Sequence, residues 1–174
     1  MIKSDEPHWY VAYVRSCCER KAAEVLARMG FEHYLPEQRE VHQWSDRKKI
    51  VKRLVLPHMI FVRCLESRRL EPVRASVYFT RYMSARGAYN PVIIPDSQMD
   101  AFMKMVEGSS RRVDVMQDVH FVAGDKVRVT SGPLAGLECT LTDVHGTRCL
   151  AVGIEVLGTA IVELSSDAIE KIPD

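Results

Sequence analysis

The sequence predicts an α+β domain, in which helices flank an antiparallel sheet, followed by a small all-β barrel. Residues 1–108 mix strand-like apolar runs with helical patterns, whereas residues 120–174 contain only short strands separated by glycine-containing turns. Charge divides the chain in the same region. Residues 1–112 carry 20 basic and 13 acidic side chains, net +7, and residues 113–174 carry 4 basic and 10 acidic, net −6. The total charge of +1 therefore conceals two segments with different expected partners.

The α+β domain is expected to begin with a buried strand over residues 9–15, which are rich in aromatic and β-branched side chains. A helix follows. Ser16 stands three residues before Glu19, which is the spacing of a capping box, and apolar residues then recur at helical intervals as far as Met29. Gly30 is suited to the left-handed conformation that ends such a helix.

The rest of this domain alternates strands with short helices. Residues 31–44 look extended, and a turn at residues 45–47 before Ile50 predicts a hairpin with a basic tip. Residues 59–62 are expected to form a central strand, because all four are apolar. The remaining elements are predicted as a short helix at 67–75, a strand at 77–82, a strand at 91–94, and a helix from 96 or 97 to Gly108.

Residues 109–119 show no periodicity and few large apolar side chains, which is typical of a linker. The sequence thus predicts one domain over residues 1–108 and a second over residues 120–174. Short strands separated by turns fit a small barrel that closes its own sheet edges. These strands are expected near residues 127–129, 140–144, 150–156 and 160–164.

Composition excludes several classes of protein. No apolar run approaches the ~20 residues that span a bilayer, and the first residues lack the apolar core of a signal peptide, so a cytoplasmic protein is expected. The five cysteines form no Cys-x-x-Cys pair and the histidines no metal-binding spacing. Neither a metal nor another cofactor is expected. Cys17 and His8 could pair as nucleophile and base, but no third orienting group accompanies them, so an enzyme is not expected.

The most specific motif lies in the barrel, between residues 124 and 141. A predicted strand ends in a turn at Gly132 and Pro133, and a second strand begins after Gly136. The glycines permit the positive φ angles that the turn needs. This pattern resembles the KOW motif of NusG-type transcription factors and several ribosomal proteins, which implies an SH3-like barrel. It departs from the motif at Cys139, where the family usually has glycine.

The first domain independently resembles the N-terminal domain of NusG proteins, and the two resemblances together cover residues 8–172. Pro57-His58-Met59 replaces the Pro-Gly-Tyr of the housekeeping factor, and the predicted linker is short. Both departures look more like specialised paralogues of the RfaH-like or UpxY-like type, the latter associated with capsular polysaccharide operons. The landmarks are residues 9–11, the helix near Glu19, residues 57–62, residues 77–79, and residues 91–95 with the following helix.

The resemblance implies a monomer that docks on the clamp helices of RNA polymerase and suppresses pausing or termination. Four apolar residues are predicted for that surface or its rim: Tyr10, Leu56, Met59 and Phe61. Strand alternation allows no more than about half of them to be exposed. The acidic barrel would recruit a ribosomal or termination protein, although Leu157 stands where the housekeeping factor tends to carry an aromatic anchor.

Nucleic-acid contact is predicted for two groups of cations, which could neutralise phosphates. Relatives of the RfaH type face non-template DNA with the strand-to-helix junction, here Arg15, Arg20 and Lys21. The second group is denser and could instead contact an acidic polymerase surface or serve solubility. It comprises Arg47, Lys48, Lys49, Lys52 and Arg53.

Three alternatives to an operon-specific antiterminator stay open at this point. The first is a general NusG elongation factor. The second is a KOW-containing, ribosome-associated protein that binds RNA, although an acidic barrel repels phosphates. The third is an enzyme with a reactive Cys17 or Cys18.

Overall fold

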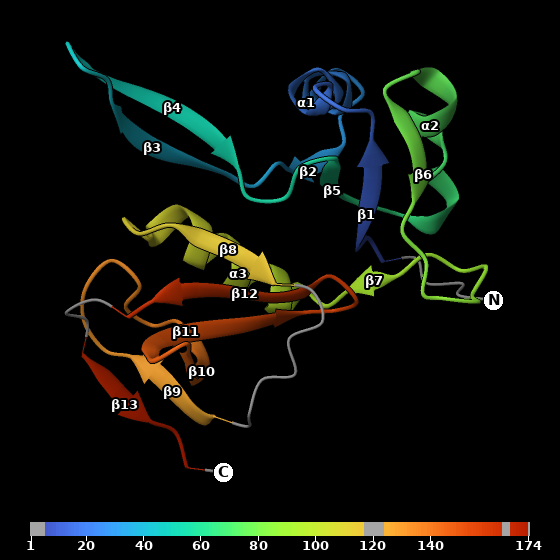
Figure 1. Cartoon of the computed structure of the whole chain (residues 1–174). Helices are drawn as coiled ribbons and strands as arrows, with labels where there is room; N and C mark the ends of the chain where they lie inside the picture. The colour runs from blue at the N-terminus through green and yellow to red at the C-terminus, as the bar shows by residue number, and fades with distance from the viewer. Residues whose placement is uncertain (1–5, 117–123, 165–167, 174) are drawn as a thin grey trace. The chain divides into compact units, whose positions relative to one another are not determined.

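The computed structural model describes residues 6–116, 124–164 and 168–173, and the chain separates into two units (Figure 1). The first unit is drawn from Met1–Pro36 and Leu56–Asp96, and the second from Glu37–Val55 and Ser97–Asp174. The predicted boundary at residue 108 differs from this division. The hairpin and the last helix of the predicted first domain belong to the second unit, where side-chain hydrogen bonds join them to each other.

An antiparallel sheet forms the first unit. Its strands follow the order β2 (Glu32–Tyr34), β5 (Met59–Cys64), β1 (His8–Val14) and β6 (Phe79–Tyr82), and β7 (Ile93–Ile94) also pairs with β1. The apolar runs at residues 9–15 and 59–62 therefore become the two central strands, as the sequence predicts.

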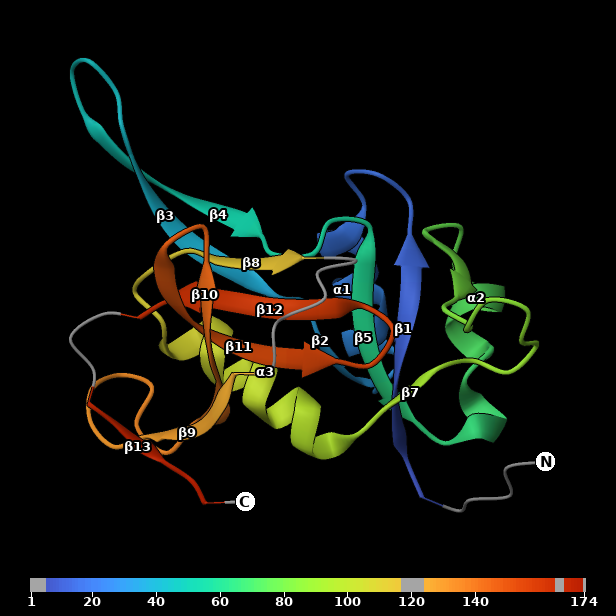
Figure 2. The ribbon, with the colours of Figure 1, turned by 60° about the horizontal axis from the view of Figure 1, so that its bottom comes forward.

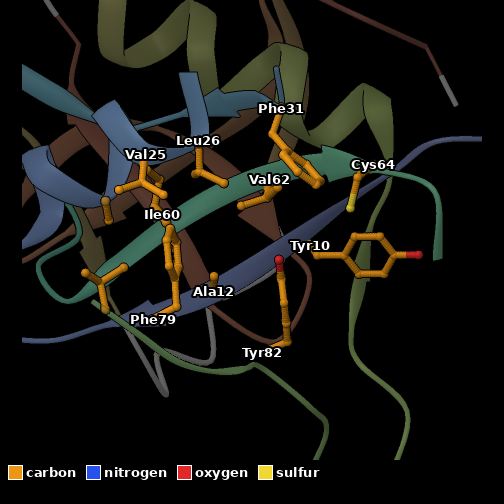
Figure 3. Packing of buried hydrophobic residues seen from close by; sticks show 12 residues of the cluster. Tyr10, Ala12, Val25, Leu26, Phe31, Ile60, Val62, Cys64, Phe79 and Tyr82 are labelled. Carbon is orange, nitrogen blue, oxygen red and sulfur yellow. The ribbon is translucent and has the colours of Figure 1, made fainter. Parts of the chain in front are cut away.

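One face of this sheet packs against α1 (Glu19–Arg28). Alternate residues of β1 and β5 point toward the helix, and Figure 3 shows Val25 and Leu26 of α1 above Ile60 and Val62 of β5. The helix contributes these two residues because apolar side chains recur on one side of it at helical spacing. The buried cluster consists of Tyr10, Ala12, Val14, Ala22, Val25, Leu26, Phe31, Ile60, Val62, Cys64, Phe79 and Tyr82.

The predicted capping box at the start of α1 is wrong. The helix begins after Cys18 with no side-chain cap, because the turn between Ser16 and Glu19 passes through a left-handed residue, Cys17 at φ 61°. Glu19 is buried, and its Oε1 accepts a hydrogen bond from the backbone N–H of His58 at 2.9 Å. Its carboxylate therefore satisfies the entry to β5 rather than the helix.

Two short helices occupy the region predicted as one. A 3₁₀ turn at Glu66–Arg68 precedes α2 (Glu71–Ala75), and Pro72 lies in the first turn of α2. A missing backbone N–H has no cost there, because first-turn amides lack intrahelical acceptors.

The barrel lies in the second unit as a six-stranded antiparallel sheet. Its order is β13, β9, β10, β11, β12, β8. β8 (Val113–Met116) falls inside the predicted linker, and its residues pair with β12, Val113 opposite Val162. The linker prediction therefore fails over these four residues, whereas residues 117–119 lie outside the described residues. The other strands are β9 (Asp125–Val129), β10 (Glu138–Val144), β11 (Thr147–Ile154), β12 (Gly158–Glu163) and β13 (Ile169–Lys171).

The KOW-like turn follows β9 as the sequence predicts. Gly132 and Gly136 adopt φ angles of 86° and 82°, and the N–H of Gly136 donates to the carbonyl of Val129 at 2.7 Å. Both angles lie in the left-handed region that glycine enters without steric cost.

Helix α3 (Asp96–Gly108) belongs to the same unit as the barrel and runs beside it (Figure 2). Gln98 Oε1 accepts a hydrogen bond from the backbone N–H of Glu155 at 2.7 Å. At the other end of the helix, a Cβ on Gly108 would lie 2.9 Å from the carbonyl oxygen of Pro133. The glycine therefore permits close approach of the KOW-like turn to the helix.

The predicted hairpin is present as a separate two-stranded ribbon (Figure 1). It consists of β3 (Glu37–Gln43) and β4 (Lys48–Leu54), and the N–H of Trp44 donates to the carbonyl of Arg47 at 2.9 Å across the turn.

Candidate functional site

The β3–β4 hairpin carries five of the eight predicted nucleic-acid-binding cations, and one of its faces has an apolar centre. Because side chains alternate along a strand, odd-numbered residues of β3 share a face with even-numbered residues of β4. We call this the outer face. Its cross-strand pairs are Arg39–Lys52, Val41–Ile50 and Gln43–Lys48.

The apolar pair at the centre of the outer face is open to solvent. Val41 is 65% exposed and Ile50 is 64% exposed, and Trp44 at the hairpin turn is 57% exposed. Large apolar side chains are rarely left in water on a ribbon that has no other role, so three of them within one hairpin indicate a contact surface.

The opposite, inner face anchors the base of the hairpin. Gln38 is buried, and its Nε2 donates to the carbonyl oxygens of Val106 at 3.3 Å and Arg111 at 3.1 Å. Its Oε1 accepts a hydrogen bond from the N–H of Val113 at 2.8 Å. One glutamine therefore ties β3 to the end of α3 and to the start of β8.

Arg53 lies opposite Gln38 and completes the anchor. Its Nη2 donates to the carbonyl of Val113 at 2.7 Å and to Gln38 Oε1 at 3.3 Å. The guanidinium also pairs with Glu40 and, at 3.5 Å, with Asp114. The guanidinium group has five N–H donors in a rigid, planar arrangement, so the Arg53 side chain can bind all of these acceptors at once. Burial alone would raise the pKa of Glu40, but hydrogen bonds from His42 and Arg53 hold it below its usual value.

The predicted nucleic-acid residues therefore differ in availability. Arg47, Lys48 and Lys49 are exposed near the hairpin turn, and Lys52 is exposed but lies 4.0 Å from Glu37. Arg53 is only 20% exposed and is engaged in the anchor, so its placement in the binding group is corrected to a structural role. Arg15, Arg20 and Lys21 are exposed at the junction of β1 and α1 in the first unit.

Three of the four residues predicted to bind polymerase are buried. Tyr10 and Phe61 have no exposed surface and Leu56 has little, whereas Met59 is half-buried. Tyr10 belongs to the core cluster, where its ring meets that of Tyr82 edge-on with centroids 6.1 Å apart. Its assignment to a docking surface is corrected to a core role, because Tyr10 lies on the buried face of the sheet, where its ring packs beside Tyr82 (Figure 3).

A charged pair covers the two tyrosines. Arg69 lies 5.8 Å from the ring centre of Tyr10 and 5.1 Å from that of Tyr82, and two of its nitrogens donate to Glu66 at 2.8 and 2.9 Å. Hydrogen bonds from Arg69 lower the pKa of Glu66. Burial raises the pKa of both tyrosines, so both hydroxyls remain protonated at neutral pH.

His58 occupies the position where the resemblance implies glycine, and the backbone there still has φ 64°. Its carbonyl accepts a hydrogen bond from Val14 at 2.8 Å, and its N–H is held by Glu19. These bonds keep a left-handed conformation that a non-glycine residue rarely adopts. A histidine thus occupies a backbone conformation that suits glycine.

The barrel position where the resemblance implies an aromatic anchor is Leu157, which is 1% exposed, whereas its neighbour Val156 is largely exposed at φ 62°. Within residues 6–116, 124–164 and 168–173, no group of three or more His, Cys, Asp or Glu side chains could hold a metal ion. No helix in the described part of the chain is long and apolar enough to cross a membrane.

Sequence reasoning missed Gln38, Val41 and Trp44. Gln38 gives no sequence signal, because its role depends on backbone groups more than 65 residues away. Val41 and Ile50 lie on opposite sides of the predicted turn at residues 45–47. Counting residues outward along both strands from this turn could have paired them. Trp44, beside a cation-rich run, was the available signal of a binding surface.

The fold and these surfaces define a binding protein built from an α+β unit and a KOW-like barrel. The family model described as "Transcription termination factor nusG" matches residues 7–103. The chain is 27% identical to NusG of Streptomyces griseus over 94% of its own length, and 26% identical to NusG of Streptomyces coelicolor over the same share. It spans 62% and 61% of these relatives, which are named transcription termination/antitermination proteins.

A solved structure of Thermotoga maritima NusG, from work on domain interaction in that protein, superposes on this chain with a TM-score of 0.52. The superposition covers 97% of this chain and 98% of the other at 20% identity. This likeness confirms the predicted fold class. The chain belongs to the NusG family. Members of this family are transcription factors and not enzymes.

Proposed function

We propose that this protein is a transcription elongation and antitermination factor that binds RNA polymerase through the first unit. The observation that carries the proposal is the family match over residues 7–103, which includes the whole sheet of the first unit. The named role of the Streptomyces relatives supports it. No cofactor takes part, because the proposed activity consists of binding.

Of the predicted polymerase-binding residues, Met59 is the one whose side chain is accessible in part. Thioether side chains adapt to the shape of a partner, which suits contact with polymerase helices. Leu56 and Phe61 would support this surface from beneath rather than touch the partner. The first-unit cations Arg15, Arg20 and Lys21 would face non-template DNA, and a KOW-domain partner would be a ribosomal or termination protein.

The finer proposal is an operon-specific antiterminator of the surface-polysaccharide type, acting in the cytoplasm as a monomer. Two residues support it. His58 stands where the housekeeping sequence has glycine, and Leu157 is buried where that sequence carries an aromatic anchor. An aliphatic, buried side chain at that loop offers a weaker anchor to a second partner. A general elongation factor is the alternative.

Retention of core RNA polymerase on the immobilised chain tests the docking step. Met59→Asp places a charge on the proposed surface and should abolish retention. Val77→Asp is the matched control, because Val77 is an exposed apolar residue of the same unit, 69% exposed. Equal retention by the Met59→Asp and unaltered chains would contradict the proposed surface. Asp at Phe61 is no test of docking, because it would bury a charge in the core.

Transcription through a pause site and an intrinsic terminator in vitro tests the activity. The unaltered chain should shorten the pause and increase read-through. An effect on every template favours the general factor, whereas an effect confined to a template with its own operon leader favours the specialised one. No effect on any template would contradict the proposed function.

A further inference from the structure

We propose that the hairpin is a single-stranded nucleic-acid-binding element, in which bases stack on Trp44 and lie along Val41 and Ile50 while flanking cations bind phosphates. This inference deepens the proposed function, on which it rests, by naming the ligand class of the hairpin. The proposed site then consists of an apolar centre and the cations around it, and not of the cations alone.

The hairpin has an excess of basic side chains. Residues 37–53 contain six basic and three acidic side chains. Two of the three acids lie at the base of the hairpin, where Glu37 is near Lys52 and Glu40 pairs with Arg53. The turn end therefore keeps three exposed cations, Arg47, Lys48 and Lys49, against Asp46 alone. This distribution favours a polyanion at the distal half of the ribbon.

The apolar centre distinguishes nucleic acid from other polyanions. Phosphate neutralisation needs cations only, so it leaves three exposed apolar side chains without a role. Aromatic rings between cations are the usual platform for unstacked bases, and every base offers a face to them. An acidic protein segment would meet the cations but offer nothing planar to Trp44.

The same chemistry favours a single strand over a duplex. Base faces in a duplex are already stacked on their neighbours and are closed to an indole ring. A single strand presents them freely, and each base–aromatic stack is worth roughly 1–3 kcal/mol. The seven-residue strands span about 23 Å, which is long enough to follow several nucleotides.

A second copy of this chain is a poorer occupant of the outer face. The Val41–Ile50 pair lies between the cross-strand pairs Arg39–Lys52 and Gln43–Lys48. Two such faces brought together would juxtapose like charges on both sides of the apolar pair, and lysines on exposed ribbons oppose strand-to-strand association for this reason.

The anchor gives the element a fixed base. Gln38 and Arg53 hold the inner face to Val113 through two hydrogen bonds of 2.8 and 2.7 Å, and Arg53 also donates to Gln38 at 3.3 Å. A ribbon held at its base and free along its outer face can insert between other molecules without losing its attachment. Binding at the turn therefore costs less ordering than binding by a loose loop.

Fluorescence of the full chain tests the inference directly, because it has two tryptophans and Trp9 is buried at 4% exposure. A mixed-sequence, single-stranded 12-mer should quench the emission of Trp44 as it binds. The matching duplex and polyglutamate of equal charge should bind more weakly and quench less. Binding of the 12-mer without any change in Trp44 emission would overturn the inference.

Substitutions separate the contributions. Trp44→Ala should weaken binding of the 12-mer about tenfold or more, and Trp44→Phe should restore most of the loss. Tyr89→Ala removes an exposed aromatic residue of the first unit and should change nothing. Val41→Ser with Ile50→Ser should weaken binding severalfold, whereas Val77→Ser should not. Equal affinities of the Trp44→Ala and Tyr89→Ala chains would overturn the stacking role.

Salt dependence measures the phosphate contacts. Lys48→Gln with Lys49→Gln should lower the slope of log affinity against log salt by about 1.4, since each phosphate contact on a single strand contributes roughly 0.7. Arg74→Gln with Arg86→Gln removes two exposed cations of the first unit as the control. An unchanged slope in the hairpin variant would overturn the phosphate contact.

Two outcomes assign the surface to another ligand. Tighter binding of duplex than single strand would overturn the stacking geometry, and equal binding of polyglutamate would make the ligand an acidic protein. The polymerase retention assay keeps this inference separate from the proposed function. Hairpin variants that lose the 12-mer should still retain polymerase, whereas loss of polymerase by the unaltered chain with oligonucleotide binding intact contradicts only the proposed function.

Discussion

Gln38 and Arg53 stand opposite each other at the base of the β3–β4 hairpin, and both bind the backbone of Val113. Gln38 accepts its N–H at 2.8 Å and Arg53 donates to its carbonyl at 2.7 Å. Val113 also begins β8, which pairs with β12 of the barrel. Two side chains thus connect the hairpin to the edge of the barrel sheet.

Gln38→Ala should destabilise the second unit by about 2 kcal/mol, because it removes the acceptor of the Val113 N–H and the side-chain donor to the Val106 carbonyl. Urea unfolding measures the loss. Gln43→Ala, at the exposed end of the same strand, is the control and should leave the midpoint unchanged. Equal midpoints for the two variants would show that water replaces the glutamine.

Acid should loosen the hairpin base before the barrel unfolds. Hydrogen bonds from His42 and Arg53 hold the pKa of Glu40 below its usual value. This contribution to stability is therefore complete above the unfolded-state pKa and is lost as the pH falls through the folded one. The protection factors of the β4 amides, which correct for the intrinsic pH dependence of exchange, should fall from pH 6 to 3 in the unaltered chain. Glu40→Gln should remove this pH-dependent component, and identical profiles for the two chains would count against the assignment.

Glu19→Ala should destabilise the first unit by about 1–3 kcal/mol, because the N–H of His58 then loses its buried acceptor in a left-handed turn. Glu24→Ala, exposed on the same helix, is the control. Thermal unfolding followed by circular dichroism compares the two. A Glu24→Ala chain that is as unstable as Glu19→Ala would point to the helix instead of the turn.

Alkylation at pH 8 should modify Cys17 well before Cys64 and Cys139. Cys17 is exposed, whereas burial raises the pKa of Cys64 to about 11 and of Cys139 to about 12. Both thiols remain largely protonated at pH 8. Because only the thiolate reacts, their alkylation should be slow. Peptide mass spectrometry after a short iodoacetamide pulse gives the order. Full polymerase retention by the Cys17-modified chain is expected, and its loss would revive a role for this thiol.

Much of the fold can be predicted from local sequence patterns. The apolar runs at residues 9–15 and 59–62, the helix ending before Gly30 and the Gly132–Gly136 turn all form where the sequence predicts them. Each is determined by residues within one element or one turn. Long-range side-chain contacts override such patterns elsewhere, as at Glu19, whose carboxylate turns from the helix to His58.

The division into units could not be predicted for the same reason. β8 is four residues long, which is too short for its alternation to be specific, and it becomes a strand because β12 supplies its backbone partners. Within the hairpin, the sequence identifies the cations but not which of them joins the anchor. Arg53 and Lys52 are neighbours of the same charge, yet contacts from a distant segment turn only Arg53 into an anchor.

The place of β8 at the end of the barrel sheet also bears on aggregation. A barrel excised at residue 120 would leave the edge of β12, around Ala160 and Val162, with free N–H and C=O groups. Bare edges of this kind recruit strands from other molecules. Excision at residue 112 keeps the covering strand, so a stretch that looks like a spacer decides whether the separated barrel stays monomeric.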